Sequence, residues 1–526
     1  MTSVVESIPQ GLVSHYQPQK STETSVLADW EIQAEKCRKV LRESLNQNWL
    51  LSASQLPPAD QLNVSTFIET CGFLSARELE ITATSATKLV EKMASGSLTA
   101  VETVTAFLKR THIAHQLTNF ATEFMNADAL KAAAELDAYF EATGKIKGPL
   151  HGVPISTKEH IEHKGRIAHS AYVALIDNVA QEDALIVQCC KKAGAVFHVR
   201  TNEPQSVMHI DCSNPIYGTT VNPHNRTLTC GGSSGREGAS LGLRCAALGI
   251  GTDLGGSVRV PAAFCGAYGL RTTALRNPYK GVCLPGAGQE SIRCVISPLA
   301  NTVEDLGLFQ KAVLDHEPWE IETSLVPQPW KQASSLKPGN FTIGVMWEGG
   351  LVRPHPPVLR ALRYAIEKLK TAGITFPECA VTQKELLEKG GEPIAPLSDY
   401  IFNLFPPRPL TIQENWAFNV RRDACREQYH KIMKDRGVDF ILCPAYVGPA
   451  ARLGDGHYIP YTAIWNLLDT PYSNFKPRSA EEEREYNKYS PEEYAEAPLA
   501  LQIVGKHFRD EDTVAAVEFV SKIIQG

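Results

Sequence analysis

Residues 231–270 read GGSSGREGASLGLRCAALGIGTDLGGSVRVPAAFCGAYGL and hold two serines in glycine-rich turns. Ser233 and Ser257 each follow a pair of glycines, and glycine lets a backbone take unusual shapes and approach a substrate closely. One lysine, Lys158, ends the upstream segment Gly-Val-Pro-Ile-Ser-Thr-Lys. Because a serine hydroxyl becomes a strong nucleophile only when a base takes its proton, this combination predicts a serine–lysine site for acyl transfer.

Lys158 can act as a base only as the neutral amine. Burial favours that form, and the short apolar segment before Lys158 predicts burial. Lys158 could instead be a surface residue that pairs with Glu159. The serine motifs downstream favour the interpretation of Lys158 as the catalytic base. The run Thr252-Asp-Leu-Gly-Gly-Ser257 predicts backbone N–H groups for an oxyanion, although Gly-Gly-Ser is also typical of a plain turn.

Three other interpretations of these motifs are weaker. The segment 231–235 fits the nucleophile elbow of α/β-hydrolases, but that elbow needs an apolar strand before it, and 225–230 makes a poor strand. Gly249-Ile-Gly-Thr-Asp lacks the full dinucleotide-binding pattern. Cys230 and Cys265 border the motifs without a histidine placed to activate them, so we expect buried structural cysteines.

The bulk composition is that of a globular protein. Of 526 residues, 43% are hydrophobic and 21% charged, and a net charge of −6 gives no electrostatic reason to bind nucleic acid. The 13 cysteines form no CxxC pair, which predicts reduced thiols and a cytoplasmic location. The N-terminus has no secretory pattern, and no apolar run is long enough to predict a membrane span.

The order of predicted elements indicates an α/β protein. Residues 1–25, rich in Ser, Thr, Gln and Pro, predict a flexible tail, and we expect 26–526 to form a single domain. Amphipathic or alanine-rich patterns predict helices over 30–51, from Thr99 onward, and over 128–142 with Gly144 as the end. Strand-like and helix-like runs then alternate, at 153–157, 184–193, 195–199, 341–345, 358–371 and 440–444.

Taken together, the motifs resemble the amidase signature family. Its pattern GGSSGGEGA is matched at 231–239, GTDxGGSxRxPAxFCGxxGL at 251–270, and the lysine motif at 152–158. The likeness runs from about Leu79 to Val517, with a signature core at about 145–310. The segments 201–206 and 211–215 resemble fatty-acid amide hydrolases, and 316–319 resembles fungal acetamidases and general amidases. The resemblance implies an α/β fold with a mixed central sheet covered by helices on both faces, and neither a metal nor an organic cofactor.

The resemblance also implies roles for particular residues. Lys158 would be the base, Ser257 the nucleophile, and Ser233, after a cis peptide bond, the proton relay between them. The backbone of Leu254, Gly255, Gly256 and Ser257 would form the oxyanion hole; Val207 and Ser233 would contact substrate; and Ser234, Asp253 and Arg259 would be supporting residues.

Three departures from the family pattern bear on function. Arg236 stands where glycine is usual; an inward guanidinium would keep Lys158 neutral or hold an anionic substrate, but we expect it to point outward. Ser297 replaces a glycine before a proline and should not affect the chemistry. The segment from about 379 to 415 looks shorter than in acetamidases, which puts acetamide in doubt as the substrate.

The sequence therefore predicts an amidase that hydrolyses a carboxylic acid amide to an acid and ammonia or an amine. One rival is an acyltransferase in which an amine intercepts the acyl-enzyme. Another is a non-catalytic amide-binding protein whose relay is disabled by Arg236. The expected partner is a small-molecule amide, with no nucleic acid and no membrane anchor, and a homodimer is left open.

Overall fold

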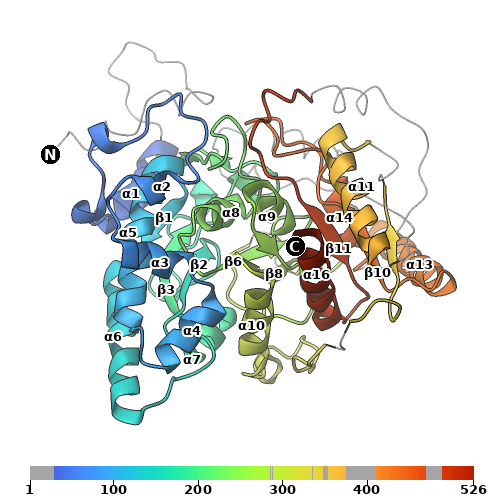
Figure 1. Cartoon of the computed structure of the whole chain (residues 1–526), viewed down its shortest axis with the longest axis horizontal. Coiled ribbons are helices and arrows are strands. Elements are labelled where there is room, and N and C mark those ends of the chain that lie inside the picture. Colours follow the sequence, from blue (N-terminus) through green and yellow to red (C-terminus); the bar gives the residue numbers. More distant parts are fainter. Residues whose placement is uncertain are drawn as a thin grey trace.

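A six-stranded mixed sheet lies at the centre of the protein (Figure 1). In this computed structural model the strand order is β1-β3-β2-β6-β8-β7; β2 runs parallel to β3 and β6, and the outer strands are antiparallel to their neighbours. The strands are β1 (Ala121–Phe124), β2 (Pro154–Lys158), β3 (Val196–Thr201), β6 (Leu248–Asp253), β7 (Tyr268–Gly269) and β8 (Val295–Ala300). The structure describes residues 29–284, 286, 288–333, 336–347, 353–372, 374, 410–469 and 489–525.

A second, three-stranded sheet is formed by the C-terminal third of the chain. Its order is β11-β10-β9, with β10 parallel to β9 and antiparallel to β11. These strands are β9 (Ile343–Val345), β10 (Phe440–Pro444) and β11 (Leu501–Val504), and a small hairpin joins β4 (Ser213–Asn214) to β5 (Gly218–Thr219). The C-terminal helix α16 (Asp510–Gln525) packs against both α10 (Val303–Leu314) and β11, and so links the two sheets (Figure 1).

Helices cover both faces of the central sheet. Residues of α8 (Gly235–Gly242) and α9 (Arg259–Cys265) belong to the core on one face, and residues of α7 (Leu185–Lys192) and α10 to the core on the other. The other helices are α1 (Asp29–Ser44), α2 (Phe67–Thr70), α3 (Ala76–Ala83), α4 (Ala86–Ala94), α5 (Ala100–Thr118), α6 (Asn126–Thr143), α11 (Pro356–Thr371), α13 (Ile412–Asp435) and α14 (Pro460–Leu467). The predicted mixed sheet with helices on both faces is confirmed.

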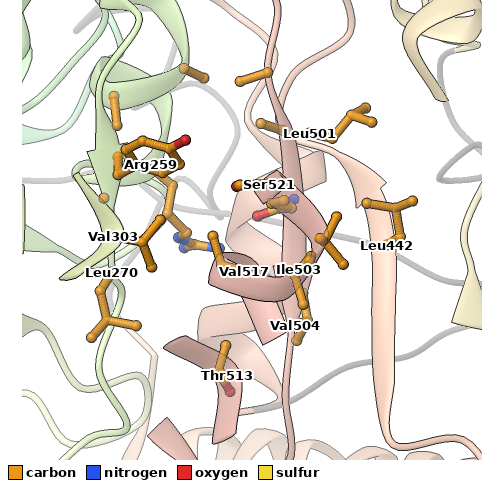
Figure 2. Close-up of a pocket in the computed structure, with 18 of the residues that line it drawn as sticks. Arg259, Leu270, Val303, Leu442, Leu501, Ile503, Val504, Thr513, Val517 and Ser521 are labelled. Atoms are coloured by element: carbon orange, nitrogen blue, oxygen red, sulfur yellow. The ribbon is translucent and has the colours of Figure 1, made fainter. Parts of the chain in front are cut away.

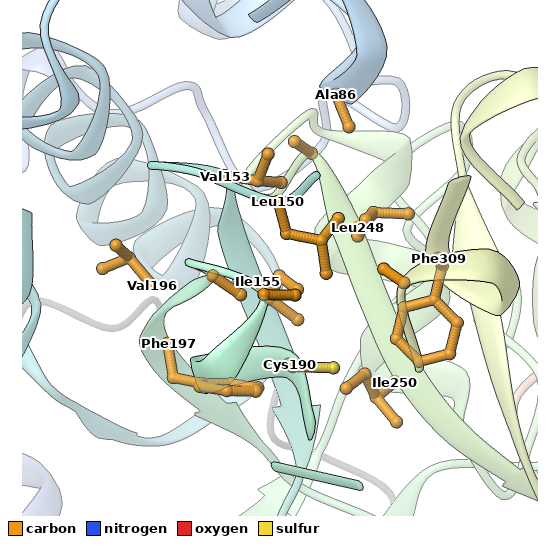
Figure 3. Packing of buried hydrophobic residues seen from close by; sticks show 14 of the residues in the cluster. Ala86, Leu150, Val153, Ile155, Cys190, Val196, Phe197, Leu248, Ile250 and Phe309 are labelled. Atoms are coloured by element: carbon orange, nitrogen blue, oxygen red, sulfur yellow. The ribbon is translucent and has the colours of Figure 1, made fainter. Parts of the chain in front are cut away.

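The core beneath β2 and β6 holds these two strands in place (Figure 3). Ile155 of β2 and Ile250 of β6 are fully buried there, next to Cys190 of α7 and Phe309 of α10. Close packing of this kind fixes side-chain positions, because a displaced strand would open voids that cost free energy. The ends of β2 and β6, where Lys158 and Asp253 lie, are therefore rigidly placed.

Most of the predicted elements are present. Thr99 caps α5 by accepting the N–H of Glu102 at 3.0 Å, and α6 ends at Gly144, whose φ is 65°. The predicted helix over 30–51 is too long, because α1 ends at Ser44. The side chain of Asn46 accepts the N–H of Asn48 and starts a separate short turn, as asparagine often does in competition with a helix.

Some predictions concern residues that the structure leaves undescribed. The predicted tail, residues 1–25, lies outside the described ranges, as does most of the segment 379–415. The twelve cysteines among the described residues are all free thiols. Within the described part of the chain, no helix has both the length and the hydropathy that crossing a bilayer requires.

Candidate active site

Lys158 and Ser233 are in direct contact inside the protein. Lys158 is the last residue of β2 and is fully buried, and its Nζ lies 2.6 Å from Ser233 Oγ. The same nitrogen lies 3.1 Å from Thr252 Oγ1, near the end of the neighbouring strand β6. Parallel pairing of β2 with β6 thus brings Lys158 beside Thr252, and the turn that contains Ser233 is held there by the bonds of the Ser234 hydroxyl to the Thr252 backbone.

The turn that presents Ser233 requires glycine before it. The Gly232–Ser233 peptide bond is cis, as expected. A Cβ atom on Gly232 would lie 2.3 Å from the carbonyl oxygen of His209, so no larger residue fits there without a shift of backbone. The next residue, Ser234, donates its N–H to the carbonyl oxygen of Ser257 at 3.0 Å, and this bond ties the two serine turns together.

The loop before Ser257 offers backbone donors to a ligand. Leu254, Gly255 and Ser257 are only partly buried, and their N–H groups have no acceptor among the described residues. The N–H of Gly256 differs from expectation, because it donates to Asp253 Oδ1 at 2.9 Å rather than facing outward. The structure therefore leaves three of the four predicted oxyanion donors available.

Two C-terminal contacts fix the shape of this loop. Gly256 has a φ of 124°, and a Cβ atom there would lie 2.0 Å from Thr462 Oγ1, so α14 approaches the loop as closely as glycine allows. The Thr462 hydroxyl donates to the carbonyl oxygen of Gly255 at 2.8 Å. Asn466, one turn further along α14, donates to Asp253 Oδ1 at 2.8 Å.

Asp253 gathers the hydrogen bonds that hold the loop. Its fully buried carboxylate accepts the N–H groups of Gly256 and Val258, and the Arg259 guanidinium binds both of its oxygens at 2.9 and 3.1 Å. Burial alone would raise the pKa of the Asp253 carboxyl, but the charge and hydrogen bonds of Arg259, with Asn466, hold that pKa well below its usual value. Asp253 is thus a permanent anion that orders the backbone around Ser257, which places the predicted supporting residues Asp253 and Arg259 in contact.

Electrostatics at Lys158 favour the neutral amine. Burial lowers the pKa of Lys158; among the carboxylates, Glu203 opposes this shift most, and Asp253 opposes it less. Burial, followed by the nearby Glu159 carboxylate, raises the pKa of Glu203 well above its usual value. This shift favours the uncharged form of Glu203, which weakens its opposition to the neutral amine of Lys158.

Comparisons with known proteins agree with this geometry. The model of the family described as Amidase matches residues 102–398 and 410–514. The chain belongs to the amidase signature family. It is 36% identical over 547 residues to an acetamidase of Emericella nidulans, covering 94% of this chain and 98% of that protein. It is 34% identical over 547 residues to an acetamidase of Aspergillus oryzae, covering 94% and 99%.

A solved structure of a fatty acid amide hydrolase is also similar. Its TM-score with this chain is 0.89 at 35% identity, over 95% of both chains. The predicted family is therefore confirmed, and so is the prediction that the protein is an enzyme, a hydrolase of the amidase class.

Arg236 of this amidase does not point outward, and the expectation that it would is wrong. The residue is fully buried in α8, and its Nη2 donates to the carbonyl oxygens of Gly218 at 2.6 Å and Cys212 at 3.3 Å. Every residue from Gly235 to Leu241 is buried, so the helix has no solvent face on which a guanidinium could lie. Arg236 is not among the main causes of the pKa shift of Lys158.

The other predicted residues have definite places in this amidase. Val207 ends the short helix η6 (Gln205–Val207), is 9% exposed and has a φ of 61°; its contact with substrate stays a prediction. The Ser234 hydroxyl bonds to the backbone of Thr252, so it joins α8 to β6. Ser297 lies on β8 and bonds to Thr272. Burial raises the pKa of the Cys230 and Cys265 thiols well above the usual value, in line with structural cysteines.

One group of side chains among the described residues has spacing that could suit a metal ion. Potential ligand atoms of Glu159, His169 and Glu203 lie within 4.8 Å of one another. The carboxylate of Glu159 already accepts the N–H groups of His169 and Ser170 at 2.9 and 3.0 Å. The Arg200 guanidinium is 3.7 Å from the same carboxylate and opposes a second cation, so we assign no metal to this group.

A cavity of about 450 Å³ lies apart from these residues (Figure 2). It opens between α9 and β7 on one side and β11 and α16 on the other, and its apolar lining includes Leu270, Val303, Leu442, Val504 and Val517. Arg259 also lines it, with the guanidinium that binds Asp253. Lys158, Ser233 and Ser257 do not, so the cavity is separate from the candidate active site.

Sequence reasoning missed three residues that contact the predicted ones. Thr252 bonds Lys158, and His160 bonds Thr252 with its Nε2 at 3.1 Å from Thr252 Oγ1. Asn466 binds Asp253 across 213 positions of sequence. Thr252 lies inside the motif at 251–270, and His160 follows the lysine motif by two residues, so their positions could have marked both as candidates. No local sequence signal distinguishes Asn466.

Proposed function

We propose that this amidase hydrolyses a carboxylic acid amide through a covalent acyl-enzyme on Ser257, with Lys158 as the base and Ser233 as the proton relay. The observation that carries the proposal is the buried contact of Lys158 Nζ with Ser233 Oγ at 2.6 Å, without an ion pair to Lys158 in the described part of the chain. A desolvated lysine beside a hydroxyl, with no carboxylate paired to it among the described residues, is favoured in the neutral state that a general base needs.

Acylation transfers one proton along this relay. Ser257 Oγ forms a bond to the amide carbon while its proton moves to Ser233, and the proton of Ser233 moves to Lys158. The N–H groups of Leu254, Gly255 and Ser257 then donate to the oxygen that gains negative charge. The Lys158 ammonium returns the proton through Ser233 to the leaving nitrogen as the C–N bond breaks.

Deacylation repeats the relay with water. Lys158, again neutral, takes a proton from water through Ser233 while the water oxygen attacks the ester carbon on Ser257. The C–O bond to Ser257 breaks, its oxygen regains a proton, and the acid leaves. An added amine could replace water, so products are to be compared with and without amine; transfer exceeding hydrolysis would indicate an acyltransferase instead.

The proposed substrate has an apolar acyl group, because two apolar side chains approach the loop: a Cβ atom placed on Gly255 would lie 3.8 Å from Ala463 Cβ and 4.0 Å from Ile459 Cδ1. A series of straight-chain amides of increasing length tests this preference. If acetamide turns over at least as well as the longer amides, the doubt about acetamide was wrong.

A cytoplasmic location stays a prediction from the free cysteines.

Covalent labelling tests the proposed nucleophile. A fluorophosphonate should form one adduct, and peptide mass mapping should place it on Ser257. An adduct on Ser233 would overturn the assignment, and no adduct in folded protein would favour the binding-only alternative.

Removal of the amine tests the proposed base. Lys158→Met keeps a chain of similar length and should lower kcat/KM by about 10²–10⁴-fold, the usual contribution of general acid–base catalysis. Lys191→Ala is the matched control, because Lys191 forms an exposed ion pair with Asp183. Near-normal activity of Lys158→Met would refute the serine–lysine mechanism.

A further inference from the structure

A buried histidine, His160, is linked to Lys158 through the hydroxyl of Thr252. His160 is fully buried, and its Nε2 lies 3.1 Å from Thr252 Oγ1. The same Thr252 oxygen lies 3.1 Å from Lys158 Nζ. Four polar atoms therefore form a continuous chain from the imidazole through the threonine hydroxyl and the lysine nitrogen to Ser233 Oγ.

The direction of each hydrogen bond in this chain decides whether Lys158 can act as a base. A neutral amine has one lone pair, and catalysis needs that lone pair to face the Ser233 hydroxyl. If the Thr252 hydroxyl donated its hydrogen to Lys158, it would compete with Ser233 for the lone pair. If Thr252 donates elsewhere, its oxygen is left to accept an N–H from Lys158, and the lone pair is free for Ser233.

His160 offers that other acceptor. Burial lowers the pKa of His160 well below its usual value; Lys158 lowers it further whenever the amine is protonated, and so does the Arg200 guanidinium. The ring is therefore neutral, and a neutral imidazole has one nitrogen that accepts. In the tautomer that carries its proton on Nδ1, an atom with no hydrogen-bond partner among the described residues, Nε2 accepts the hydrogen of the Thr252 hydroxyl.

We propose that His160 is a positioning residue that, by accepting the Thr252 hydroxyl, directs the lone pair of Lys158 toward Ser233. The inference rests on the proposed base role of Lys158. It adds a residue that touches neither the substrate nor the reacting serines.

The chain contains a matched pair that lacks this link. His163 is buried like His160, and its Nε2 lies 2.9 Å from Thr157 Oγ1. Thr157 precedes Lys158 in β2, so its side chain points to the opposite face of the sheet. Loss of the His163–Thr157 bond should thus disturb packing as much as loss of the His160–Thr252 bond, without affecting Lys158.

Two amide substitutions at position 160 test the proposal. In His160→Gln the amide oxygen can reach the place of Nε2, whereas in His160→Asn the side chain is too short to bind Thr252. We expect His160→Asn to lower kcat about tenfold, as for loss of one orienting hydrogen bond, with KM unchanged. His160→Gln should recover most of that loss, and His163→Asn should leave kcat unchanged.

A double-mutant cycle shows whether the effect passes through Thr252. Thr252→Val should itself lower kcat, and adding His160→Asn in that background should cause no further loss. Equal kcat values for the Gln and Asn variants, or a full tenfold loss in the Thr252→Val background, would overturn the proposal. Failure of the base assignment is distinguishable, because only then would Lys158→Met retain activity.

Discussion

Asp253→Asn is the substitution that most directly tests how the Ser257 loop is held. The carboxylate accepts hydrogen bonds from Gly256, Val258, Arg259 and Asn466, and it is the only charge partner shown for the Arg259 guanidinium among the described residues. An asparagine keeps the size of the side chain but presents one acceptor and one N–H₂ group to these donors. At least one donor then loses its acceptor, and the guanidinium loses its counter-charge.

The expected cost follows from the burial of this ion pair. The Asp253 side chain is fully buried and that of Arg259 is 9% exposed, so solvent screens the pair very little. Removing one partner of a buried pair typically lowers the free energy of unfolding by about 3–5 kcal/mol. The loop also loses its fixed shape, and misplacing even one oxyanion donor typically lowers kcat by about 10²–10³-fold.

Urea denaturation and steady-state kinetics measure both effects. Asp177→Asn is the control, because Asp177 pairs with Lys36 at 2.7 Å but is 78% exposed, and exposed pairs add little to stability. We expect the control to keep the wild-type urea midpoint and kcat. If Asp253→Asn behaves like the control in both assays, Asp253 does not order the loop and the reasoning is refuted.

Three further outcomes depend on buried ionisable groups. Burial, against hydrogen bonds from Ser156 and Thr201, raises the pKa of Glu237 from the usual 4.5 to about 7, so stability from this group is lost as pH rises from about 4.5 to 7; Glu237→Gln should remove that loss from the melting curves. Burial lowers the pKa of His112 and His198 to about 4, so stability from these groups should fall as pH drops from about 6.5 toward 4. The Glu237→Gln variant, which lacks the opposing effect of Glu237, isolates this loss, and a constant melting temperature of that variant over the range would contradict it. Arg236→Met should not move the acidic limb of the pH dependence of kcat/KM, whereas a shift would mean that the guanidinium acts on Lys158.

The proposed reactive residues could be singled out from the sequence because their signals are local. The second glycine of each pair is required, because a Cβ atom on Gly232 would lie 2.3 Å from the carbonyl oxygen of His209 and one on Gly256 would lie 2.0 Å from Thr462 Oγ1. The Gly-Gly-Ser motifs therefore stand out in the sequence. The caps at Thr99 and Gly144 likewise mark helix ends with single residues. Strand pairing then brings Lys158 to Ser233 without any further sequence signal.

What the sequence did not predict depends on distant contacts. Arg236 was expected outside because charged residues are usually exposed. All residues of α8 from Gly235 to Leu241 are buried, however, and the carbonyl groups that bind Arg236 come from another segment, for example from Gly218. Helix α13 was not predicted, since only Tyr429 and Met433 of its residues are buried and little apolar periodicity marks it. The three available oxyanion donors could not be told from the fourth, because only the fold shows Gly256 turned toward Asp253.

The contacts that α14 makes with the loop before Ser257 have a consequence for when activity can appear during synthesis. Thr462 binds Gly255 across 207 positions, so a ribosome that has already made Lys158, Ser233 and Ser257 has not yet made the helix that shapes their loop. The nascent chain then carries the proposed reactive side chains but lacks the helix that fixes the backbone donors. We expect amidase activity to appear only after α14 has docked, and a fragment that ends before α14 to be inactive.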